Sequence, residues 1–214
     1  AADVDGRPVQ GSPLWLPMWY EEEAFEWQDS VMYLIFTDRF LDSSLSLDNL
    51  RRGQMPEIGD FADGRYRVLA VEPHEILDAC VVQLTREGRV TVGRQTALVQ
   101  IAKRFIFHRD MPVIDVRYEI SNRYHTPLET RFAIELNLGL DSRFAGKARI
   151  NTESGEAIAS VAGCLEGARQ LRVRDPRGRF SLSVDIGAKA DIYHFPLECV
   201  VRTGASLKPA PQGV

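Results

Sequence analysis

Apolar and polar side chains alternate with a period of two along several stretches of the second half of the chain. The alternation is strictest at residues 114–120, 132–138 and 180–186. A period of two places successive side chains on opposite faces of a strand, so that one face packs on a core and the other meets water. This pattern is typical of antiparallel sheets, because strands of parallel sheets are apolar on both faces.

Turn signals rich in Gly, Pro, Asn and Asp separate these stretches, at residues 86–89, 108–112, 122–127 and 175–178. Closely spaced strands without long helical periodicity predict an all-β fold, either a sandwich or a barrel. Residues 141–168, rich in Gly, Ala and Ser, have the least regular pattern. We expect them to form long connections between sheets.

The first 30 residues differ from the rest of the chain. They contain three prolines, an aromatic-acidic run and all three tryptophans, Trp15, Trp19 and Trp27. Prolines at this spacing predict an extended arm that packs by its aromatic side chains. A buried strand is predicted at residues 31–36, and a loop leading into a short helical turn at residues 42–49.

Length and charge narrow the class of protein. A chain of 214 residues is long enough for one good core or two small ones. A net charge of −4 argues against nucleic acid or an anionic membrane as a partner. No apolar run approaches the roughly 20 residues that span a bilayer, and the N-terminus lacks a basic start and an apolar signal core. We therefore expect a cytoplasmic protein; the missing initial Met leaves open a fragment that has lost a signal peptide.

Metal-ligating residues are scattered along the chain without a ligand pair. There is no C-x-x-C and no H-E-x-x-H, so a zinc site and a disulfide framework are not expected. Phosphate and dinucleotide motifs are also absent, and we predict no cofactor. The cysteines are expected to be small buried apolar side chains. The residues concerned are Cys80, Cys164, Cys199, His74, His108, His125 and His194.

Glu135 is the most interesting candidate for binding chemistry. It lies in the middle of a predicted strand, opposite the apolar face, and Asn137 shares its face two residues on. If that face lines a groove, the two side chains can hydrogen-bond sugar hydroxyls. In the alternative, Glu135 faces water or pairs with a basic residue of a neighbouring strand, and Lys103 and Arg104 are candidates for that partner.

Aromatic side chains complete the candidate carbohydrate-binding set. Sugar rings stack on exposed aromatics, and Tyr118, Trp15 and Trp19 are the residues proposed here. The alternative for the tryptophans is burial in a core or an interface, because each large ring hides roughly 150–250 Å² of surface.

Seven short motifs occur in order between about residues 33 and 201: "DRFLDSSLSLDNLRRG", "GDFADGRYRV", "LTREGRV", "VRYEISN", "RFAIELNLGL", "LRVRDPRGRFSLSV" and "HFPLECVV". In order and spacing they resemble the C-terminal β-sandwich module of α-amylases and 4-α-glucanotransferases of glycoside hydrolase family 57. The resemblance implies a large antiparallel super-sandwich of the galactose-mutarotase type, packed beside a catalytic barrel. The catalytic carboxylates of that family belong to the barrel, so no residue here inherits a catalytic role.

The chain departs from this family at both ends. After "FP", Cys199 and "RTGASLKPAPQGV" stand where the family has a Thr- and Ser-containing stretch, so we expect its last strands to be missing and a sheet edge to be exposed. Near the start, "PLWLPMWYEEE" and "FEWQDSVMYLIFTDRF" resemble the first barrel strand of family 13 α-amylases. We predict an amylase-like leader at residues 1–42 and an accessory β-sandwich at residues 43–214.

The leading hypothesis is a non-catalytic accessory domain of an α-glucan-acting enzyme. Its partners would be the catalytic barrel and an α-glucan or maltooligosaccharide. One alternative is a freestanding sugar enzyme such as an aldose 1-epimerase, which needs a His and a Glu beside the ring, and Glu135 with His108 or His125 is the candidate pair. Another alternative is a purely structural module.

Overall fold

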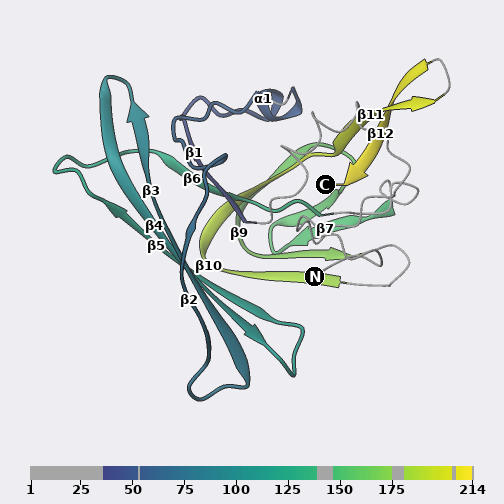
Figure 1. The fold of residues 1–214 in the computed structure, drawn as a ribbon. Helices are drawn as coiled ribbons and strands as arrows, with labels where there is room; N and C mark the ends of the chain where they lie inside the picture. Colours follow the sequence, from purple (N-terminus) through teal and green to yellow (C-terminus); the bar gives the residue numbers. More distant parts are fainter. Residues whose placement is uncertain (1–35, 53, 139–146, 175–180, 204–205, 214) are drawn as a thin grey trace. The chain divides into compact units, whose positions relative to one another are not determined.

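The computed structural model describes residues 36–52, 54–138, 147–174, 181–203 and 206–213. In these residues the chain forms β-strands that pair antiparallel throughout, and one short helix (Figure 1). The all-β antiparallel prediction is therefore confirmed. The elements are β1 (Thr37–Leu41), α1 (Leu47–Arg51), β2 (Arg67–Pro73), β3 (Ala79–Val92), β4 (Gln95–His108), β5 (Ile114–Asn122), β6 (Arg131–Glu135), β7 (Arg149–Thr152), β8 (Gly155–Ile158), β9 (Gly163–Arg174), β10 (Ser181–His194), β11 (Leu197–Thr203) and β12 (Ser206–Gly213).

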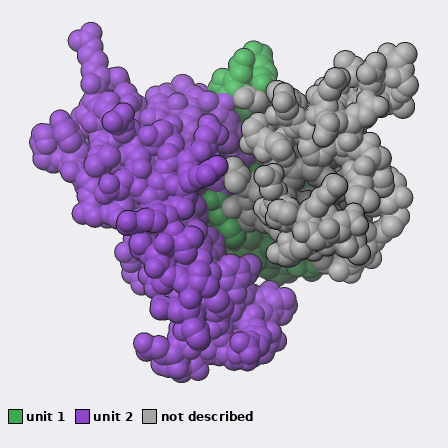
Figure 2. Space-filling model, in the orientation of Figure 1, with its two compact units in different colours: residues 1–36, 46–54, 136–214 green, residues 37–45, 55–135 purple. Residues whose placement is uncertain are grey.

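The chain divides into two compact units, shown in different colours in Figure 2. Unit 1 contains residues 1–36, 46–54 and 136–214, and unit 2 contains residues 37–45 and 55–135. Each unit has its own cluster of buried apolar side chains. This agrees with a length sufficient for two small cores.

Unit 2 is a two-layer arrangement of sheets. Its larger sheet has the order β2-β3-β4-β5, and the ribbon β1-β6 forms the second layer. Alternate residues of β4 are buried from Ala97 to Phe105, which marks the face that packs on a core. Phe40 of β1 and Phe132 of β6 pack over Val99 and Ile101 of this face.

The segment at residues 55–61 joins the two layers of unit 2 by backbone hydrogen bonds. The amide of Ile58 donates to the carbonyl of Phe40 in β1 at 2.9 Å, and the carbonyl of Ile58 accepts from Thr91 in β3 at 2.8 Å. One side of the layered structure is thereby closed, and fewer backbone groups are left unpaired.

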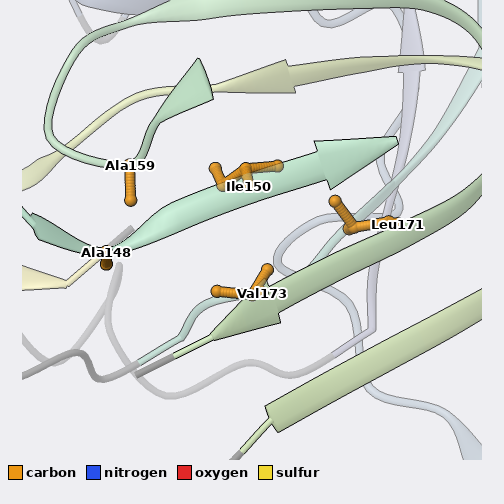
Figure 3. Close-up of a cluster of buried hydrophobic side chains, with 5 residues drawn as sticks. All are labelled: Ala148, Ile150, Ala159, Leu171 and Val173. Atoms are coloured by element: carbon orange, nitrogen blue, oxygen red, sulfur yellow. The ribbon is translucent and has the colours of Figure 1, made fainter. Parts of the chain in front are cut away.

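Unit 1 contains the sheet β10-β9-β7-β8, the hairpin β11-β12 and α1. Figure 3 shows its buried cluster, in which Ile150 of β7 lies against Leu171 and Val173 of β9, with Ala148 and Ala159 beside them. The helix begins after Ser46, whose hydroxyl accepts a hydrogen bond from the amide of Asn49 at 3.2 Å. The short helical turn expected after residue 42 is thus confirmed. Among the described residues, no helix is long and apolar enough to cross a membrane.

Several local predictions were wrong. Residues 86–89 are not a turn but the middle of β3, and the hairpin turns instead at Gly93, whose φ is 60°. Gly88 misled the prediction because the ring of Phe61 packs on its bare Cα. Residues 149–158 form β7 and β8 rather than irregular connections, and β6 ends at Glu135 although the alternation continues to residue 138.

Other predictions lie wholly or partly outside the described residues. These are the tryptophan-rich arm and the strand at residues 31–36, of which only Phe36 is described. The division into a leader at residues 1–42 and a sandwich at 43–214 stays a prediction, although the last part of that leader, β1, pairs with β6. At the other end, the segment after "FP" contains the β11-β12 hairpin.

Candidate functional site

The polar centre of unit 2 is an ion pair between Asp38 of β1 and Lys103 of β4. Lys103 Nζ lies 2.6 Å from Asp38 Oδ2, and the two side chains are only 5% and 0% exposed, respectively. The period of β4 places Lys103 on the buried face between Ile101 and Phe105. Water is therefore nearly excluded from both charges, and each charge depends on the other to compensate for its lost hydration.

Two tyrosines enclose this ion pair. Tyr66 donates its hydroxyl hydrogen to Asp38 Oδ2, and Lys103 Nζ lies 4.2 Å from the Tyr66 ring centre and 5.3 Å from that of Tyr118. Both distances are in the range of cation–π attraction. Burial lowers the pKa of Lys103, an effect that Asp38 opposes. Burial and then Asp38 raise the pKa of both Tyr66 and Tyr118, so both hydroxyls stay protonated near neutral pH.

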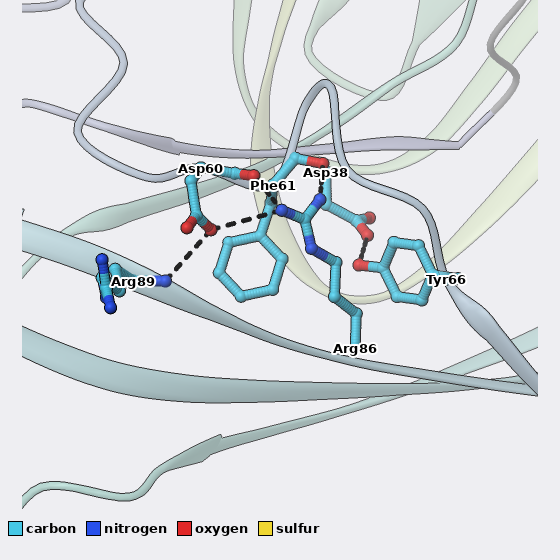
Figure 4. A network of polar contacts seen from close by, with 6 residues as sticks. All are labelled: Asp38, Asp60, Phe61, Tyr66, Arg86 and Arg89. Carbon is cyan, nitrogen blue, oxygen red and sulfur yellow. Dashed lines mark hydrogen bonds and ion pairs between the residues drawn. The ribbon is translucent and has the colours of Figure 1, made fainter.

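A second network holds the loop after residue 59 on β3 (Figure 4). The guanidinium of Arg86 donates to the carbonyl of Phe61 at 2.8 Å and also reaches the carbonyl of Asp60. The Asp60 carboxylate accepts from the amide of Arg89 at 3.0 Å. Arg86 also lies over the ring of Phe61, 5.0 Å from its centre. Figure 4 shows this network beside the Tyr66–Asp38 hydrogen bond.

Glu135 is held by Arg39, its neighbour in the β1-β6 ribbon. Arg39 Nε lies 2.6 Å from Glu135 Oε2, and Arg39 Nη1 lies 2.6 Å from Glu57 Oε2. One guanidinium thus bridges two carboxylates, and all three side chains are mostly buried. Burial raises the pKa of Glu57, and Arg39 opposes that rise. The single positive charge of Arg39 is shared between the two carboxylates. Both are hydrogen-bonded to the guanidinium, and neither is left free for proton transfer.

The described candidates for sugar binding are placed apart from any shared groove. Glu135 pairs with a basic residue of the neighbouring strand, as the alternative prediction had it. The partner is Arg39, so the candidates Lys103 and Arg104 were wrong. Asn137 is buried beyond the end of β6, and Tyr118 packs edge-on against Phe132 at 5.8 Å. Trp15 and Trp19 lie outside the described residues.

The histidines do not complete an acid–base pair with Glu135 in the described part of the chain. His108 Nε2 lies 2.8 Å from Asp115 Oδ2, and His125 packs against Tyr124 at 4.2 Å between ring centres. His194 is buried against Gly163, and burial lowers the pKa of its imidazole. The described residues also contain no group of three or more potential metal ligands.

A shallow depression lies on the outer face of the β2-β5 sheet. Ala102 forms part of its floor, and Gln83, Arg104 and the exposed pair Arg117–Glu119, with an N–O distance of 2.9 Å, surround it. Its volume is about 130 Å³, and it is open to solvent. Polar side chains at this spacing are expected on the water-facing side of an amphipathic sheet.

The centre at Asp38 and Lys103 was missed, although the pattern contained a signal for it. Lys103 shares the period of Val99, Ile101 and Phe105, which predicts a buried ammonium and therefore a buried carboxylate partner. The partner carboxylate is Asp38 because β1 crosses the sheet at this point. No pattern within β4 specifies that crossing.

Five of the seven family-like motifs meet in unit 2 and contribute to these networks. Their side chains form the Asp38–Lys103 ion pair, the tyrosines around it, the network of Arg86 with Asp60 and Phe61, and the aromatic core. The contributing residues are Asp38, Arg39 and Phe40 of the first motif, Asp60, Phe61 and Tyr66 of the second, Arg86 and Gly88 of the third, Tyr118 of the fourth, and Phe132 and Glu135 of the fifth. The motifs therefore encode a folded core.

Comparison with known proteins identifies the source of these motifs. The family model described as "Alpha-amylase/4-alpha-glucanotransferase, C-terminal" matches residues 28–204. The 4-alpha-glucanotransferase of Thermococcus litoralis is 24% identical over 193 residues, which cover 90% of this chain and 25% of that protein. The 4-alpha-glucanotransferase of Thermococcus kodakarensis is 24% identical over 186 residues, covering 87% of this chain and 23% of that protein.

A solved structure shows the same fold. The crystal structure of the Thermococcus litoralis 4-alpha-glucanotransferase aligns with a TM-score of 0.64 at 21% identity, covering 94% of this chain and 28% of that one. The present chain thus spans about a quarter of the length of these relatives. The resemblance drawn from the short motifs is confirmed, since the family model covers most of the chain: it belongs to the family of α-amylase/4-α-glucanotransferase C-terminal domains.

Proposed function

We propose that this chain is a non-catalytic accessory domain of a larger enzyme that acts on α-glucans. The observation that carries the proposal is the family match over residues 28–204, joined to relatives of which it covers only about a quarter. The relatives are named as 4-alpha-glucanotransferases. A glucan substrate and a catalytic barrel elsewhere in the same polypeptide are therefore the partners that we propose.

The geometry of the carboxylates supports a non-catalytic role. Glycoside cleavage uses two carboxyl groups on either side of the scissile bond, one of which donates or accepts a proton. Glu57 and Glu135 are close together in space, but both are bonded to Arg39. Asp38 is buried against Lys103. These three side chains have charged partners inside unit 2, which supports a role in the fold rather than in catalysis.

The experiment that tests this proposal uses the 214-residue chain and maltoheptaose. We expect neither shorter nor longer maltooligosaccharides after prolonged incubation, because hydrolysis and glucan transfer both need catalytic carboxyls that this role places elsewhere. Chromatography of the products distinguishes the two reactions. Turnover that persists through purification and is lost in Glu135→Gln would overturn the proposal.

Carbohydrate binding remains a weaker proposal. The described candidates give it little support, because Glu135 and Tyr118 have partners inside unit 2 and Asn137 is buried. Trp15 and Trp19 are the remaining candidates. Titration calorimetry with maltoheptaose, compared between the chain and its Trp15→Ala and Trp19→Ala variants, tests them; absence of heat at millimolar sugar would remove the proposal.

Among the described residues, no contact supports the epimerase alternative. It requires a His and Glu135 on either side of a sugar ring, whereas Glu135 bonds Arg39 and His108 bonds Asp115. A purely structural module remains compatible with the same geometry. It differs from the accessory role in predicting that removal of this domain affects enzyme stability and leaves glucan affinity unchanged.

A further inference from the structure

Strand β5 forms a free edge of the β2-β5 sheet (Figure 1). It pairs with β4 over residues 114–122, and no described strand pairs with its other side. The carbonyl of Val113 accepts from His108 at 3.3 Å, and the amide of Arg123 donates to Leu98 at 2.8 Å, so both ends of β5 are fixed in direction. Because backbone groups of an antiparallel strand point alternately to either side, those that point away from β4 belong to residues 114, 116, 118, 120 and 122. Among the described residues these groups have no backbone partner.

β5 lacks the features that keep other sheet edges from accepting a further strand. Edge strands are commonly very short, bulged or interrupted by proline. The opposite edge, β2, has a register shift between Val68 and Ala70 and ends at Pro73. In the other four-stranded sheet, β10 has two register shifts and β8 has four residues. β5 has nine residues in regular pairing and no proline, so its outward backbone groups are a template for strand addition.

The two faces of β5 carry different side chains. The outer face has Asp115, Arg117 and Glu119, and Arg117 bonds Glu119 at 2.9 Å while both side chains stay mostly exposed. On the face that packs on the core, Ile114 is 49% exposed and Ile120 is 43% exposed. A strand added beside β5 would cover part of this apolar surface and would meet a row of charges on the other face.

We propose that β5 pairs antiparallel with β5 of a second copy of the chain, about a two-fold axis at Tyr118. Tyr118 is the middle residue of the strand, so all nine residues find a partner in this register. The outward-pointing backbone groups of the two copies then face each other and can form a continuous ladder of hydrogen bonds. On the outer face, Arg117 lies opposite Glu119 of the second copy, and Glu119 lies opposite its Arg117. Such an interface is isologous, because the same surface of both copies takes part.

Charge complementarity selects both this register and a second copy as the occupant. The alternation of backbone groups allows the register to shift only by two residues. A pairing centred at residue 117 would place Arg117 opposite Arg117 of the second copy, and a pairing centred at residue 119 would do the same for Glu119. Like charges directly opposite each other destabilise a strand pair. In the proposed register the four charges alternate in sign around the axis, so each has an opposite charge beside it and another across from it.

Sedimentation velocity of the 214-residue chain tests the pairing. We expect a reversible dimer that becomes populated as the concentration rises to about 100 µM, because one strand pair buries less than the roughly 1,600 Å² of a standard interface. Glu119→Arg places like charges opposite each other and should weaken dimerisation at least about tenfold, and adding Arg117→Glu restores opposite signs and should recover it. Glu87→Arg makes the same change on an exposed side chain of the inner strand β3 and should have no effect. A monomer at every concentration, or a dimer that Glu119→Arg leaves unchanged, would overturn the inference.

Introduced cysteines test the register directly. In the proposed dimer, residue 115 lies opposite residue 121 of the second copy in a non-hydrogen-bonded pair, whose Cα atoms are about 4.5 Å apart and within reach of a disulfide. Asp115→Cys with Ser121→Cys should give a covalent dimer on oxidation, in a Cys80→Ser background because Cys80 is itself exposed. Either substitution alone should not, because equal positions lie about 20 Å apart across the axis.

The single variants decide the outcome of this crosslinking. A covalent dimer formed equally well by Asp115→Cys or Ser121→Cys alone would overturn the inference, and so would the absence of a covalent dimer in the double variant. Neither experiment involves a glucan, so the pairing of β5 is tested independently of the proposed function.

Discussion

Asp38 and Lys103 lie on different sheets of unit 2 and meet at 2.6 Å in a nearly water-free core. The ammonium lies beside the rings of Tyr66 and Tyr118, and Tyr66 donates to the same carboxylate oxygen. A slip of β1 by one residue along β6 would turn Asp38 away from Lys103 and leave both charges unpaired. The pair therefore specifies how the β1-β6 ribbon sits on the sheet.

Breaking this pair should destabilise the chain strongly. Asp38→Asn keeps the shape of the side chain but leaves a buried ammonium, and we expect a loss of about 3–5 kcal/mol in the free energy of unfolding. Urea denaturation measures it. Glu119→Gln, which breaks the exposed pair with Arg117, is the control and should cost less than about 1 kcal/mol. Equal effects of the two substitutions would contradict a buried, interdependent pair.

The double variant Asp38→Leu with Lys103→Met should be more stable than the sum of its single substitutions predicts. Removing both charges also removes the need to pair them, so that the coupling energy is expected to be about 1–3 kcal/mol. A double-mutant cycle from urea denaturation gives this number. Strict additivity would show that the two side chains act independently.

The stability of the chain should fall as the pH rises above about 10. Tyr66 and Tyr118 have raised pKa values in the folded state, so the unfolded chain loses these protons first and becomes favoured. Lys103 acts in the opposite direction below its unfolded pKa, because its pKa is lowered on folding. Absorbance near 295 nm should show a late ionisation step that coincides with alkaline unfolding and to which Tyr66 and Tyr118 contribute. Tyr66→Phe should reduce the amplitude of that late step by one tyrosine.

Arg39→Met should destabilise the chain in a pH-dependent way. It leaves Glu57 and Glu135 mostly buried without their shared cation, so we expect a loss of about 2–4 kcal/mol near pH 8. Burial already raises the pKa of Glu57, and removing Arg39 raises it further. Glu57 becomes protonated more readily as the pH falls, and the loss should shrink towards about pH 4.

A second substitution tests the cause of the Arg39 effect. Glu57→Gln in the Arg39→Met background removes one of the two unpaired carboxylates and should recover about 1 kcal/mol near pH 8. Thermal or urea denaturation at both pH values measures the recovery. A loss that is independent of pH would instead point to missing packing of the Arg39 side chain.

Gly88→Ala should disrupt the packing of the loop after residue 59 on β3. A Cβ at position 88 would lie 2.7 Å from the ring of Phe61 and would also collide with the Asp60 carboxylate, so the loop must shift. We expect a loss of about 2–3 kcal/mol, typical of overpacking. Gly187→Ala is the matched control in a strand, because a Cβ there meets no atom within 4 Å.

The antiparallel β character of the chain follows from its sequence because each strand carries the period of two locally. The short motifs, in their order, were sufficient to identify the family, whereas the buried centre at Asp38 and Lys103 was missed although the period of β4 contained a signal for it. The turn-forming residue types predicted a turn at residues 86–89 that does not exist, since the glycine that suggests it is required by a distant ring, Phe61. The expectation of a buried side chain was also wrong for Cys80, which is exposed.

What only the tertiary structure decided is which distant side chains meet. Arg39 rather than Lys103 bonds Glu135, and Asp38 rather than Glu135 bonds Lys103, because β1 both pairs with β6 and crosses the β2-β5 sheet. Charge pairing depends on register and on the stacking of layers, and neither is written in the local alternation of a strand. The sequence by itself determined strands, faces and family; the conversion of Glu135 from a candidate sugar ligand into a partner of Arg39 required the fold.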